Sequence, residues 1–310
     1  MNPQALLNRL DKTRRHLGKW AKREQLHAWR LYDRDMPEFP LAIDLYGEAL
    51  HVQVFERKRP LEDEQLQILE QALREHFELE PLQLAIKTRK RQRGLSQYEK
   101  LADSAPSFLV RERHLQFEVN LHRYLDTGLF LDHRDTRHMV GQRAEGKTFL
   151  NLFAYTGSFT AYAAAGGARR TVTVDMSRTY QEWSERNLQH NGLADPKKHQ
   201  FVQSDVTTFL DKVIESRARF DLIVLDPPSF SNSKRMHATF DVQRDQLELL
   251  QKTIRLLAPG GELFFSNNRQ GFSLDPQISE LAEVEEITDK TIPRDFARHR
   301  PHRCWLIRKP

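Results

Sequence analysis

The chain has 310 residues, 39% of them hydrophobic, which is long enough for two domains with separate cores. Its formal net charge of +5 permits a polyanionic partner without requiring one. The single cysteine, Cys304, excludes an internal disulfide and a zinc site built from several cysteines. The first residues lack the apolar core of a signal peptide, and no window has the roughly 20 apolar residues of a membrane span. We therefore expect a soluble cytoplasmic protein that binds no membrane, and the histidine spacing suggests no metal.

The first element is a predicted helix over residues 5–30. Leu6, Leu10, Leu17 and Trp20 recur at helical spacing and form an apolar stripe, while the other faces are rich in Lys and Arg. We interpret this element as a basic helical arm.

The segment after the arm has the pattern of a small α+β domain. Alternating apolar residues on both sides of Gly47 predict a hairpin. In chain order we expect a hairpin over residues 41–55, a helix over 62–77, a strand over 83–87 and a second hairpin over 108–121. We assign residues 1–125 to the arm and this domain.

Residues 125–134 connect the small domain to the rest of the chain. The simplest interpretation is a turn that leads into a helix capped by Asp132. The alternative is a lid that crosses a cofactor pocket, with Asp132 and Arg134 as its polar contacts.

An apolar strand that begins at Phe149 runs into a turn at Gly157, and a helix of small residues follows. This is the beginning of a Rossmann-like unit, where the glycine lets the backbone approach a ligand closely. One glycine, where the dinucleotide fingerprint has three, argues against NAD. We expect the turn to bind a cofactor without a pyrophosphate, and the candidate residues are Asn151, Phe153, Tyr155, Thr156, Gly157 and Ser158.

Three later strands each end in an acid. Asp175, followed by Met176 and Ser177, is placed to accept hydrogen bonds from a ribose diol. Asp205 ends the next strand, where it can reach an adenine amino group, and Asp226 ends the third. Acids at strand ends often cap the next helix, but the ordered set of three favours a pocket for S-adenosylmethionine (SAM).

Asp226 opens the motif Asp226-Pro227-Pro228-Ser229-Phe230, which we call the ledge. The two prolines fix φ twice and donate no N–H, so the ledge is stiff and rich in hydrogen-bond acceptors. SAM methyltransferases use such a ledge to hold a flat base. We expect Asp226 to fix the base edge or the methionine amine, and Phe230 to stack on the base. The alternative is that Phe230 is a core residue.

Strands and helices alternate regularly from about residue 147 to residue 308, as in a doubly wound sheet. The last strands are expected at 261–267, 284–288 and 304–308. We therefore predict an α/β protein with a class I SAM-methyltransferase fold. Its Rossmann-like seven-stranded sheet forms a catalytic domain over residues 126–310, beside the smaller amino-terminal α+β domain and helical arm.

Five motifs carry a resemblance to a known family along the chain. They are Thr127–Arg134, Asn151–Ser158, Thr173–Ser177, Asp226–Lys234 and Phe265–Asn268. Together they resemble the RlmK family of guanine-N7 methyltransferases, which form the carboxyl-terminal half of the bifunctional 23S rRNA methyltransferases RlmKL. The segments 229–234 and 266–268 are the most specific, and Ala154 stands where this family has a serine.

The resemblance implies methylation of a guanine N7 in 23S rRNA, or its precursor, during large-subunit maturation. It also implies an N2-guanine methyltransferase as a partner or fused half. Basic residues are then expected to bind RNA phosphates, although charge runs are often only solvated surface. These candidates are Lys12, Arg14, Arg15, Lys19, Lys22 and Arg23 in the arm, Lys87, Arg89, Lys90, Arg91 and Arg93 after the small domain's last strand, and Lys234 and Arg235 after the ledge.

The chemistry separates this reaction from that of related enzymes. Methylation of a pyrimidine C5 requires a thiolate, and those relatives carry a cysteine after the strand that here ends with Phe265–Asn268. Guanine N7 has an exposed lone pair and no proton to lose, so the enzyme has only to position and desolvate it. Two alternatives stay open: methylation of an exocyclic amine such as guanine N2, and a non-catalytic RNA-binding assembly factor on a SAM fold.

Overall fold

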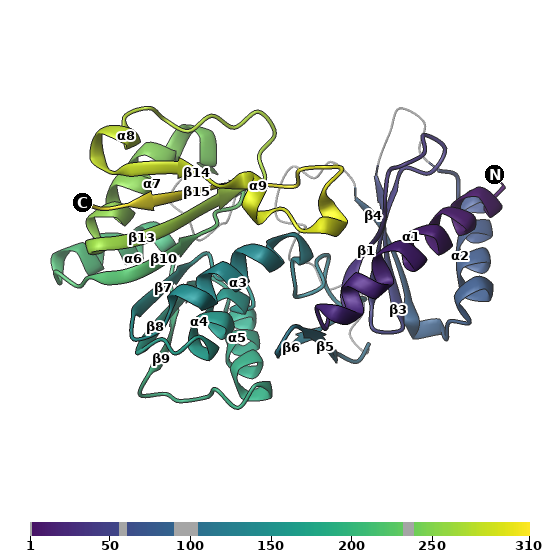
Figure 1. The fold of residues 1–310 in the computed structure, drawn as a ribbon, viewed down its shortest axis with the longest axis horizontal. Helices are drawn as coiled ribbons and strands as arrows, with labels where there is room; N and C mark the ends of the chain where they lie inside the picture. The colour runs from purple at the N-terminus through teal and green to yellow at the C-terminus, as the bar shows by residue number, and fades with distance from the viewer. Residues whose placement is uncertain (1, 56–60, 90–104, 232–238) are drawn as a thin grey trace. The chain divides into compact units, whose positions relative to one another are not determined.

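Two β-sheets organise the chain in the computed structural model, which describes residues 2–55, 61–89, 105–231 and 239–310 (Figure 1). The four-stranded sheet belongs to an amino-terminal unit, made of Met1–Leu131 together with Arg294–His299. The seven-stranded sheet belongs to a carboxyl-terminal unit, made of Asp132–Pro293 and Arg300–Pro310. The first unit thus extends beyond residue 125, and it includes a late segment that the sequence assigned to the catalytic domain.

The basic arm is a helix, α1 (Gln4–Arg23), and it is shorter than predicted. The three leucines of its apolar stripe are buried, as expected. The helix ends because Gln25 has a left-handed φ of 56°, which turns the chain away from the helix axis. Residues 28–30, which were predicted to be helical, instead begin strand β1 (Ala28–Asp33), so that part of the prediction is wrong.

The predicted elements of the small domain are confirmed. They are β2 (Leu41–Tyr46), β3 (Ala49–Phe55), α2 (Asp63–Phe77), β4 (Leu84–Arg89), and the hairpin of β5 (Phe108–Glu112) and β6 (Leu115–Val119). A 3₁₀ turn that was not predicted, η1 (Pro81–Gln83), precedes β4. Gly47 turns the first hairpin with a φ of 64°, a conformation that favours glycine. Helix α2 then carries the chain from β3 to β4, which run parallel, so the sheet order is β1-β2-β3-β4.

The predicted seven-stranded α/β sheet is also confirmed, with the order β14-β15-β13-β10-β7-β8-β9. Its strands are β7 (Thr148–Leu152), β8 (Arg170–Asp175), β9 (His199–Gln203), β10 (Phe220–Leu225), β13 (Leu257–Asn267), β14 (Glu283–Glu286) and β15 (Arg303–Arg308). Strand β15 runs antiparallel to β13 and β14, and the other pairs are parallel. Strand β14 ends before the predicted residue 288, because Thr288–Thr291 form the helical turn α9.

Helices cover both faces of this sheet. They are α3 (Arg134–Arg143), α4 (Ser158–Ala165), α5 (Arg178–His190), α6 (Val206–Glu215), α7 (Val242–Arg255) and α8 (Ile278–Leu281). Alternate residues of β10 supply separate cores, since Leu222 and Val224 pack with α3 and α4, whereas Ile223 and Leu225 pack with α6 and α7. Within the described ranges, no helix is both long and apolar enough to span a membrane.

The sheet topology predicts where a ligand binds. The first strand of the sheet, β7, has β8 on one side and β10 on the other. Strands β8 and β9 are therefore added on one side of β7 and the later strands on the other, which makes β7 the topological switch point. Ligands of open α/β sheets bind at the carboxyl ends of the strands beside such a switch point. The turn after β7 and the ledge after β10 both lie at this edge.

Candidate active site

The turn between β7 and α4 has an uncommon backbone conformation. Phe153, Tyr155 and Gly157 have φ values of 55°, 51° and 69°. Left-handed backbone costs a non-glycine residue about 1–3 kcal/mol and often occurs at ligand sites. At Gly157 an added Cβ would lie 2.7 Å from the Cβ of Ser184 on α5. Glycine is therefore required here, although the group that comes close to it is a serine of the protein.

Asp175, at the end of β8, holds this turn. Its Oδ2 accepts the N–H of Tyr155 at 2.9 Å, and its Oδ1 accepts the N–H of Ser177 at 2.8 Å. Burial raises the pKa of Asp175 to about 6, although the backbone N–H groups oppose that shift. A carboxylate has about four acceptor positions, so it can still accept hydrogen bonds from ligand hydroxyls.

Two of the predicted cofactor residues, one in β7 and one in the turn itself, are buried. Asn151 is buried in β7, and its amide donates to the hydroxyl of Thr160 at 3.0 Å. Thr156 is buried as well, and its carbonyl accepts the amide of Asn187 at 2.8 Å. Burial and these partners let Asn151 and Thr156 support the turn, and their role as direct cofactor contacts stays a prediction.

The other predicted residues of this edge are half-buried, namely Phe153, Tyr155, Ser158, Met176, Ser177 and Asp205. Asp205 is the N-cap of α6, and its Oδ1 accepts the N–H of Thr208 at 3.0 Å. Every hydrogen bond that the Asp205 carboxylate accepts from the described part of the chain falls on Oδ1. The capping interpretation is therefore correct for Asp205, and its Oδ2 remains available to a ligand.

The ledge is braced by the end of the neighbouring strand β13. The hydroxyl of Ser266 donates to Asp226 Oδ1 at 2.7 Å, and the hydroxyl of Ser229 donates to Asn268 Oδ1 at 2.6 Å. Parallel pairing of β10 with β13 brings these residues together across about 40 positions of sequence. Burial raises the pKa of Asp226 to about 6, against the effect of the Ser266 hydrogen bond.

The two ends of the ledge differ in exposure. Pro227 is buried and Pro228 is half-buried, so the backbone after Asp226 is packed into the protein. Phe230 is 48% exposed, and the interpretation of this ring as a core residue is therefore wrong. An exposed ring beside a rigid acceptor-rich segment can stack on a planar ligand.

Two buried histidines near Asp226 were not predicted from the sequence. His133 Nε2 lies 3.5 Å from Asp226 Oδ2. The His302 ring stacks on His133 with 4.2 Å between centroids, and its Nδ1 lies 3.1 Å from Asp132 Oδ2. Burial lowers the pKa of both imidazoles, so both favour the neutral form. His133 lies within one of the quoted motifs, whereas no local pattern marks His302 in the irregular segment before β15.

Asp132 does not cap the following helix. It lies in the 3₁₀ turn η3 (Leu131–His133), and His133 occupies the N-cap position of α3. The Asp132 carboxylate is engaged by His302 instead, which explains why the capping prediction is wrong. Arg134 is fully buried at the start of α3. Asp132, His133 and His302 are the described residues that bring three potential metal ligands together, and the absence of a metal stays a prediction.

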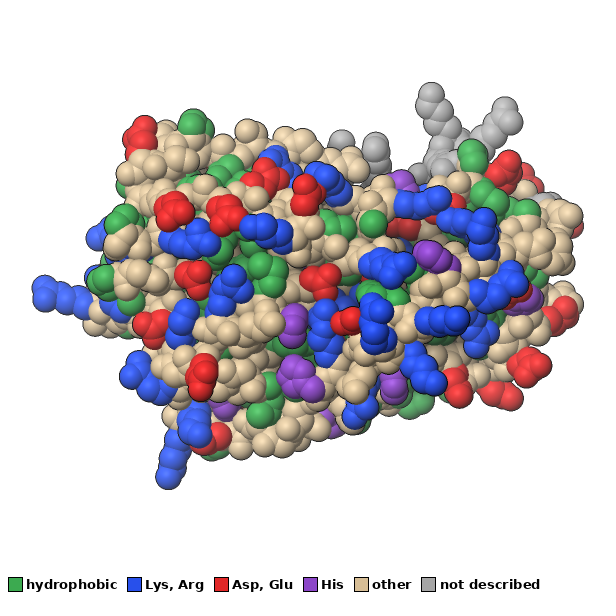
Figure 2. Space-filling view, viewed as in Figure 1, with side chains coloured by type: hydrophobic (Ala, Val, Ile, Leu, Met, Phe, Trp, Pro, Cys, Tyr) green, Lys and Arg blue, Asp and Glu red, His purple; other side chains and the backbone are tan. Residues whose placement is uncertain are grey.

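The six basic residues predicted on the arm are all exposed on α1. Five of them, Lys12, Arg15, Lys19, Lys22 and Arg23, lie opposite the buried leucine stripe at helical spacing. Arg14 lies near the buried side, with its guanidinium over the ring of Phe77. Figure 2 shows Lys and Arg side chains gathered over the region where Figure 1 places α1.

The second basic run is only partly described. Lys87 is buried in β4, and its ammonium donates to the carbonyls of Tyr124 and Leu125. Its prediction as a phosphate contact is therefore wrong, because the group is already enclosed by acceptors. The side chain of Arg89, and the residues Lys90, Arg91, Arg93, Lys234 and Arg235, lie outside what the structure describes.

Comparison with known sequences assigns the chain to a family. Residues 32–290 match the family described as S-adenosylmethionine-dependent methyltransferase. "Ribosomal RNA large subunit methyltransferase K" of Neisseria meningitidis serogroup B is 49% identical over 306 residues, covering 97% of this chain and 86% of that protein. "Ribosomal RNA large subunit methyltransferase K/L" of Allochromatium vinosum is also 49% identical, over 311 residues that cover 98% of this chain. The match covers only 42% of that K/L protein.

Solved structures show the same fold. A methyltransferase structure in complex with S-adenosylhomocysteine (SAH) superposes with a TM-score of 0.78 at 23% identity, covering 99% of this chain and 82% of the other. The SAM-dependent methyltransferase from Agrobacterium tumefaciens has a TM-score of 0.63 at 18% identity, covering 92% and 90%. At these identities the likeness concerns the fold alone.

Proposed function

The chain belongs to the SAM-dependent methyltransferase family, and from this we propose that it methylates N7 of a guanine in 23S rRNA during large-subunit maturation. SAM is the cofactor of the family, and SAH is the product that remains after methyl transfer. The K and K/L relatives are named for ribosomal RNA of the large subunit, which supports rRNA as the substrate class.

One observation supports direct transfer to a ring or amine nitrogen over methylation of a pyrimidine C5: the described residues of the candidate active site offer no thiolate nucleophile. Where a C5 methyltransferase needs a thiolate, the end of β13 carries Ser266 and two asparagines. Cys304 faces Ser266 in the neighbouring strand, but it is fully buried, and burial raises the pKa of its thiol. A buried neutral thiol cannot attack a base. Cytosine C5 is therefore disfavoured, whereas guanine N7 requires no covalent intermediate.

The proposed step transfers one methyl group to guanine N7 and needs no general base, because N7 has no proton to lose. SAM would supply the methyl group as a sulfonium, from which attack by the N7 lone pair would release the neutral thioether sulfur of SAH. The guanine then carries the positive charge that the sulfonium loses. The Asp226 carboxylate would hold the guanine edge or the methionine amine, beside acceptors of Pro227 and Pro228. Phe230 would stack on the base, and stacking fixes the approach of N7 to the methyl group.

The cofactor would be held by the turn after β7 and the acids beside it. We assign Asp175 to the ribose hydroxyls, Asp205 to the adenine amino group and Gly157 to the methionine part. Asp132 and Arg134 are the proposed polar contacts from the start of α3. Phe153, Tyr155, Ser158, Met176 and Ser177 would line the same pocket, with Asn151 and Thr156 supporting the turn.

RNA would be held by the basic face of α1, together with the basic residues in the range 89–93 and Lys234 and Arg235. The K/L relatives are more than twice as long as their match to this chain, so a second methyltransferase as partner or fused half is part of the proposal.

The decisive experiment is incubation of the full chain with SAM and 23S rRNA, followed by nucleoside mass spectrometry and chemical cleavage. N7-methylguanosine carries a positive imidazole ring and is cut by borohydride and aniline treatment. We expect one methylated guanine that is cleaved under this treatment. A cleavage-resistant methylguanosine would favour the exocyclic amine, for which Asp226 also offers acceptors. RNA binding without methylation of naked rRNA or precursor particles would favour the assembly factor.

A further inference from the structure

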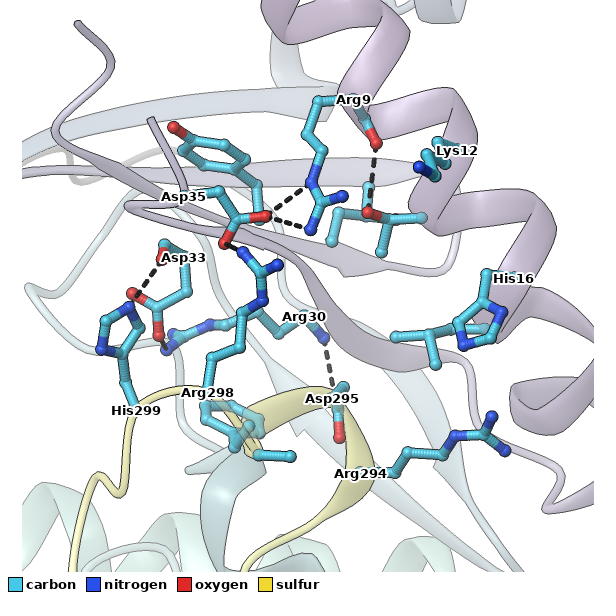
Figure 3. A pocket seen from close by; sticks show the side chains of 16 residues that line it. Arg9, Lys12, His16, Arg30, Asp33, Asp35, Arg294, Asp295, Arg298 and His299 are labelled. Atoms are coloured by element: carbon cyan, nitrogen blue, oxygen red, sulfur yellow. Dashed lines mark hydrogen bonds and ion pairs between the residues drawn. The ribbon is translucent and has the colours of Figure 1, made fainter. Parts of the chain in front are cut away.

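The amino-terminal unit contains a pocket of about 230 Å³ that belongs to no part of the candidate active site (Figure 3). It opens between α1, β1 and the late segment Arg294–His299. Five Lys or Arg residues line it against three Asp, an excess of two positive charges. Its apolar lining includes Leu17, Leu31 and the ring of Phe296.

The acids of this pocket already have partners within it, two as ion pairs and one through a backbone N–H. Asp35 pairs with Arg9 at 2.5 Å and with Arg298 at 2.8 Å. Asp33 pairs with Arg30 at 2.9 Å. Asp295 accepts the backbone N–H of Arg30 at 2.9 Å. The carboxylates therefore brace the pocket wall instead of offering themselves to a cation.

The remaining basic side chains are uncommitted. Those of Lys12, His16 and Arg294 are exposed, and none makes a hydrogen bond or ion pair with another residue in the described ranges. Figure 3 shows these three on the right-hand side of the pocket, away from the Asp33 and Asp35 ion pairs on the left. An ammonium, an imidazole and a guanidinium together form a donor set suited to a phosphate group.

We propose that this pocket binds a backbone phosphate of the RNA substrate, with Lys12 and Arg294 as the charged contacts and His16 as a further donor. The inference rests on the proposed function in one respect, namely that the substrate is RNA. The pocket volume of about 230 Å³ equals that of roughly seven or eight water molecules at about 30 Å³ each. That space suits a phosphate group and part of its ribose. The contact would anchor the RNA strand independently of its base sequence.

The test uses the full chain with the double substitution Lys12→Ala and Arg294→Ala, and measures the affinity for a 23S rRNA fragment at several salt concentrations. Removal of one phosphate contact should reduce the slope of log affinity against log salt by about 0.7–0.9 and weaken binding roughly tenfold at low salt. Lys12→Arg with Arg294→Lys keeps both charges and should keep the slope. Lys197→Ala with Arg219→Ala, two exposed positions before β9 and β10, is the matched control and should change nothing.

Three outcomes would overturn the inference. An unchanged slope in the double alanine variant would mean that no RNA phosphate sits in the pocket. An equal loss in the Lys197 and Arg219 control would mean that total charge, not the pocket, determines binding. Tight binding of inorganic phosphate that disappears in the double variant, with RNA affinity unaffected, would assign the pocket to free phosphate. Methylation by the unsubstituted chain is measured separately, so failure of the pocket and failure of the proposed reaction give different results.

Discussion

Asp175 and Asp226 are each more costly to ionise than an ordinary aspartate. Burial raises the pKa of both carboxyls to about 6. Such groups interact most favourably with a ligand that brings hydrogen-bond donors or positive charge into the same buried site. SAM brings ribose hydroxyls, an ammonium and a sulfonium. The elevated pKa values therefore fit carboxyl groups whose ionised form is stabilised when the cofactor binds.

Asp175→Ala should weaken SAM binding roughly 10- to 100-fold, because it removes a charge-assisted acceptor worth about 1.5–3 kcal/mol. Isothermal titration calorimetry measures this directly. Asp195→Ala removes a carboxylate that pairs with Lys198 before β9, and it should leave the affinity unchanged. Unchanged SAM affinity in Asp175→Ala would mean that the ribose lies elsewhere.

Asp226→Asn should stabilise the cofactor-free protein at neutral pH while abolishing activity. The folded state holds the Asp226 proton more tightly than the unfolded chain does, so ionisation at pH 7 lowers the free energy of unfolding, by up to about 3 kcal/mol for a pKa raised from 3.8 to about 6. That penalty grows as pH rises from about 4 to about 6, and it disappears below pH 4, where the carboxyl is protonated in both states.

Thermal denaturation of Asp226→Asn and the unsubstituted chain, at pH 4 and at pH 7, tests this prediction. The variant should melt at a higher temperature at pH 7 and at a similar temperature at pH 4. A lower melting temperature at pH 7 would show that the Ser266 and His133 contacts of the carboxylate outweigh its burial.

Phe230→Ala should lower kcat/KM on RNA roughly 5- to 100-fold, since base stacking on an aromatic ring is worth about 1–3 kcal/mol. The exposed ring contributes little to the core, so SAM affinity and melting temperature should not change. Leu281→Ala, another exposed large hydrophobic residue, is the matched control for methylation. Parallel loss of SAM binding in Phe230→Ala would contradict the stacking role.

At the scale of elements, hydrophobic patterning predicted which segments form strands and helices but not where each one ends. The arm stops at Arg23 because Gln25 adopts a left-handed backbone, a conformation that glutamine rarely takes and that no pattern announced. Lys87 belongs to a basic run, yet its position in a strand directs it inward to two carbonyls. Period-two alternation does not reveal this, because it places Lys87 on the face opposite Leu84 and Ile86, where a polar residue is expected to meet solvent.

The candidate site likewise has parts that the sequence predicts and parts that it does not. The acids at strand ends and the ledge were predictable because each is a local motif that follows an apolar strand. The brace from Ser266 and Asn268, and the His133–His302 stack, arise from strand pairing and from a chain reversal far along the sequence. Contacts between residues tens or hundreds of positions apart leave no local pattern.

Helix α1 offers a test of its basic face. Substitution of Arg15, Lys19 and Lys22 with alanine should reduce the salt slope of RNA binding by about 0.7–0.9 for each phosphate that the helix no longer neutralises. Arg14→Ala, on the same helix but turned toward Phe77, should reduce it less. An equal effect per charge at Arg14 would mean that the net charge of the helix, rather than one face, attracts RNA.

At the scale of the whole molecule, the two ligands should protect different sets of segments from hydrogen exchange. SAM should slow exchange in the turn after β7 and at the carboxyl ends of β8 and β10, because ordering a ligand there opposes local opening. RNA should slow exchange in α1 and in residues 294–299, and its target guanine should add protection at the ledge. Mass spectrometry after deuterium labelling, with each ligand in turn, measures both patterns.

Asp175→Ala serves as the control in the exchange experiment. It should remove the protection by SAM and leave the protection by RNA unchanged. RNA protection confined to the carboxyl-terminal unit would assign RNA binding to that unit alone.

Because residues 294–299 belong to the amino-terminal unit, this unit is completed only late in synthesis of the chain. Arg30 and Asp295 meet across 265 positions, so at a synthesis rate of about 5–20 residues per second the second wall of the pocket leaves the ribosome roughly 13–53 seconds after the first. A nascent chain therefore has α1 but no finished pocket. Strand β15 follows almost at once, so the pocket and the last pairing of the seven-stranded sheet become available together. A polypeptide still under translation would thus lack the proposed phosphate site until its seven-stranded sheet can close.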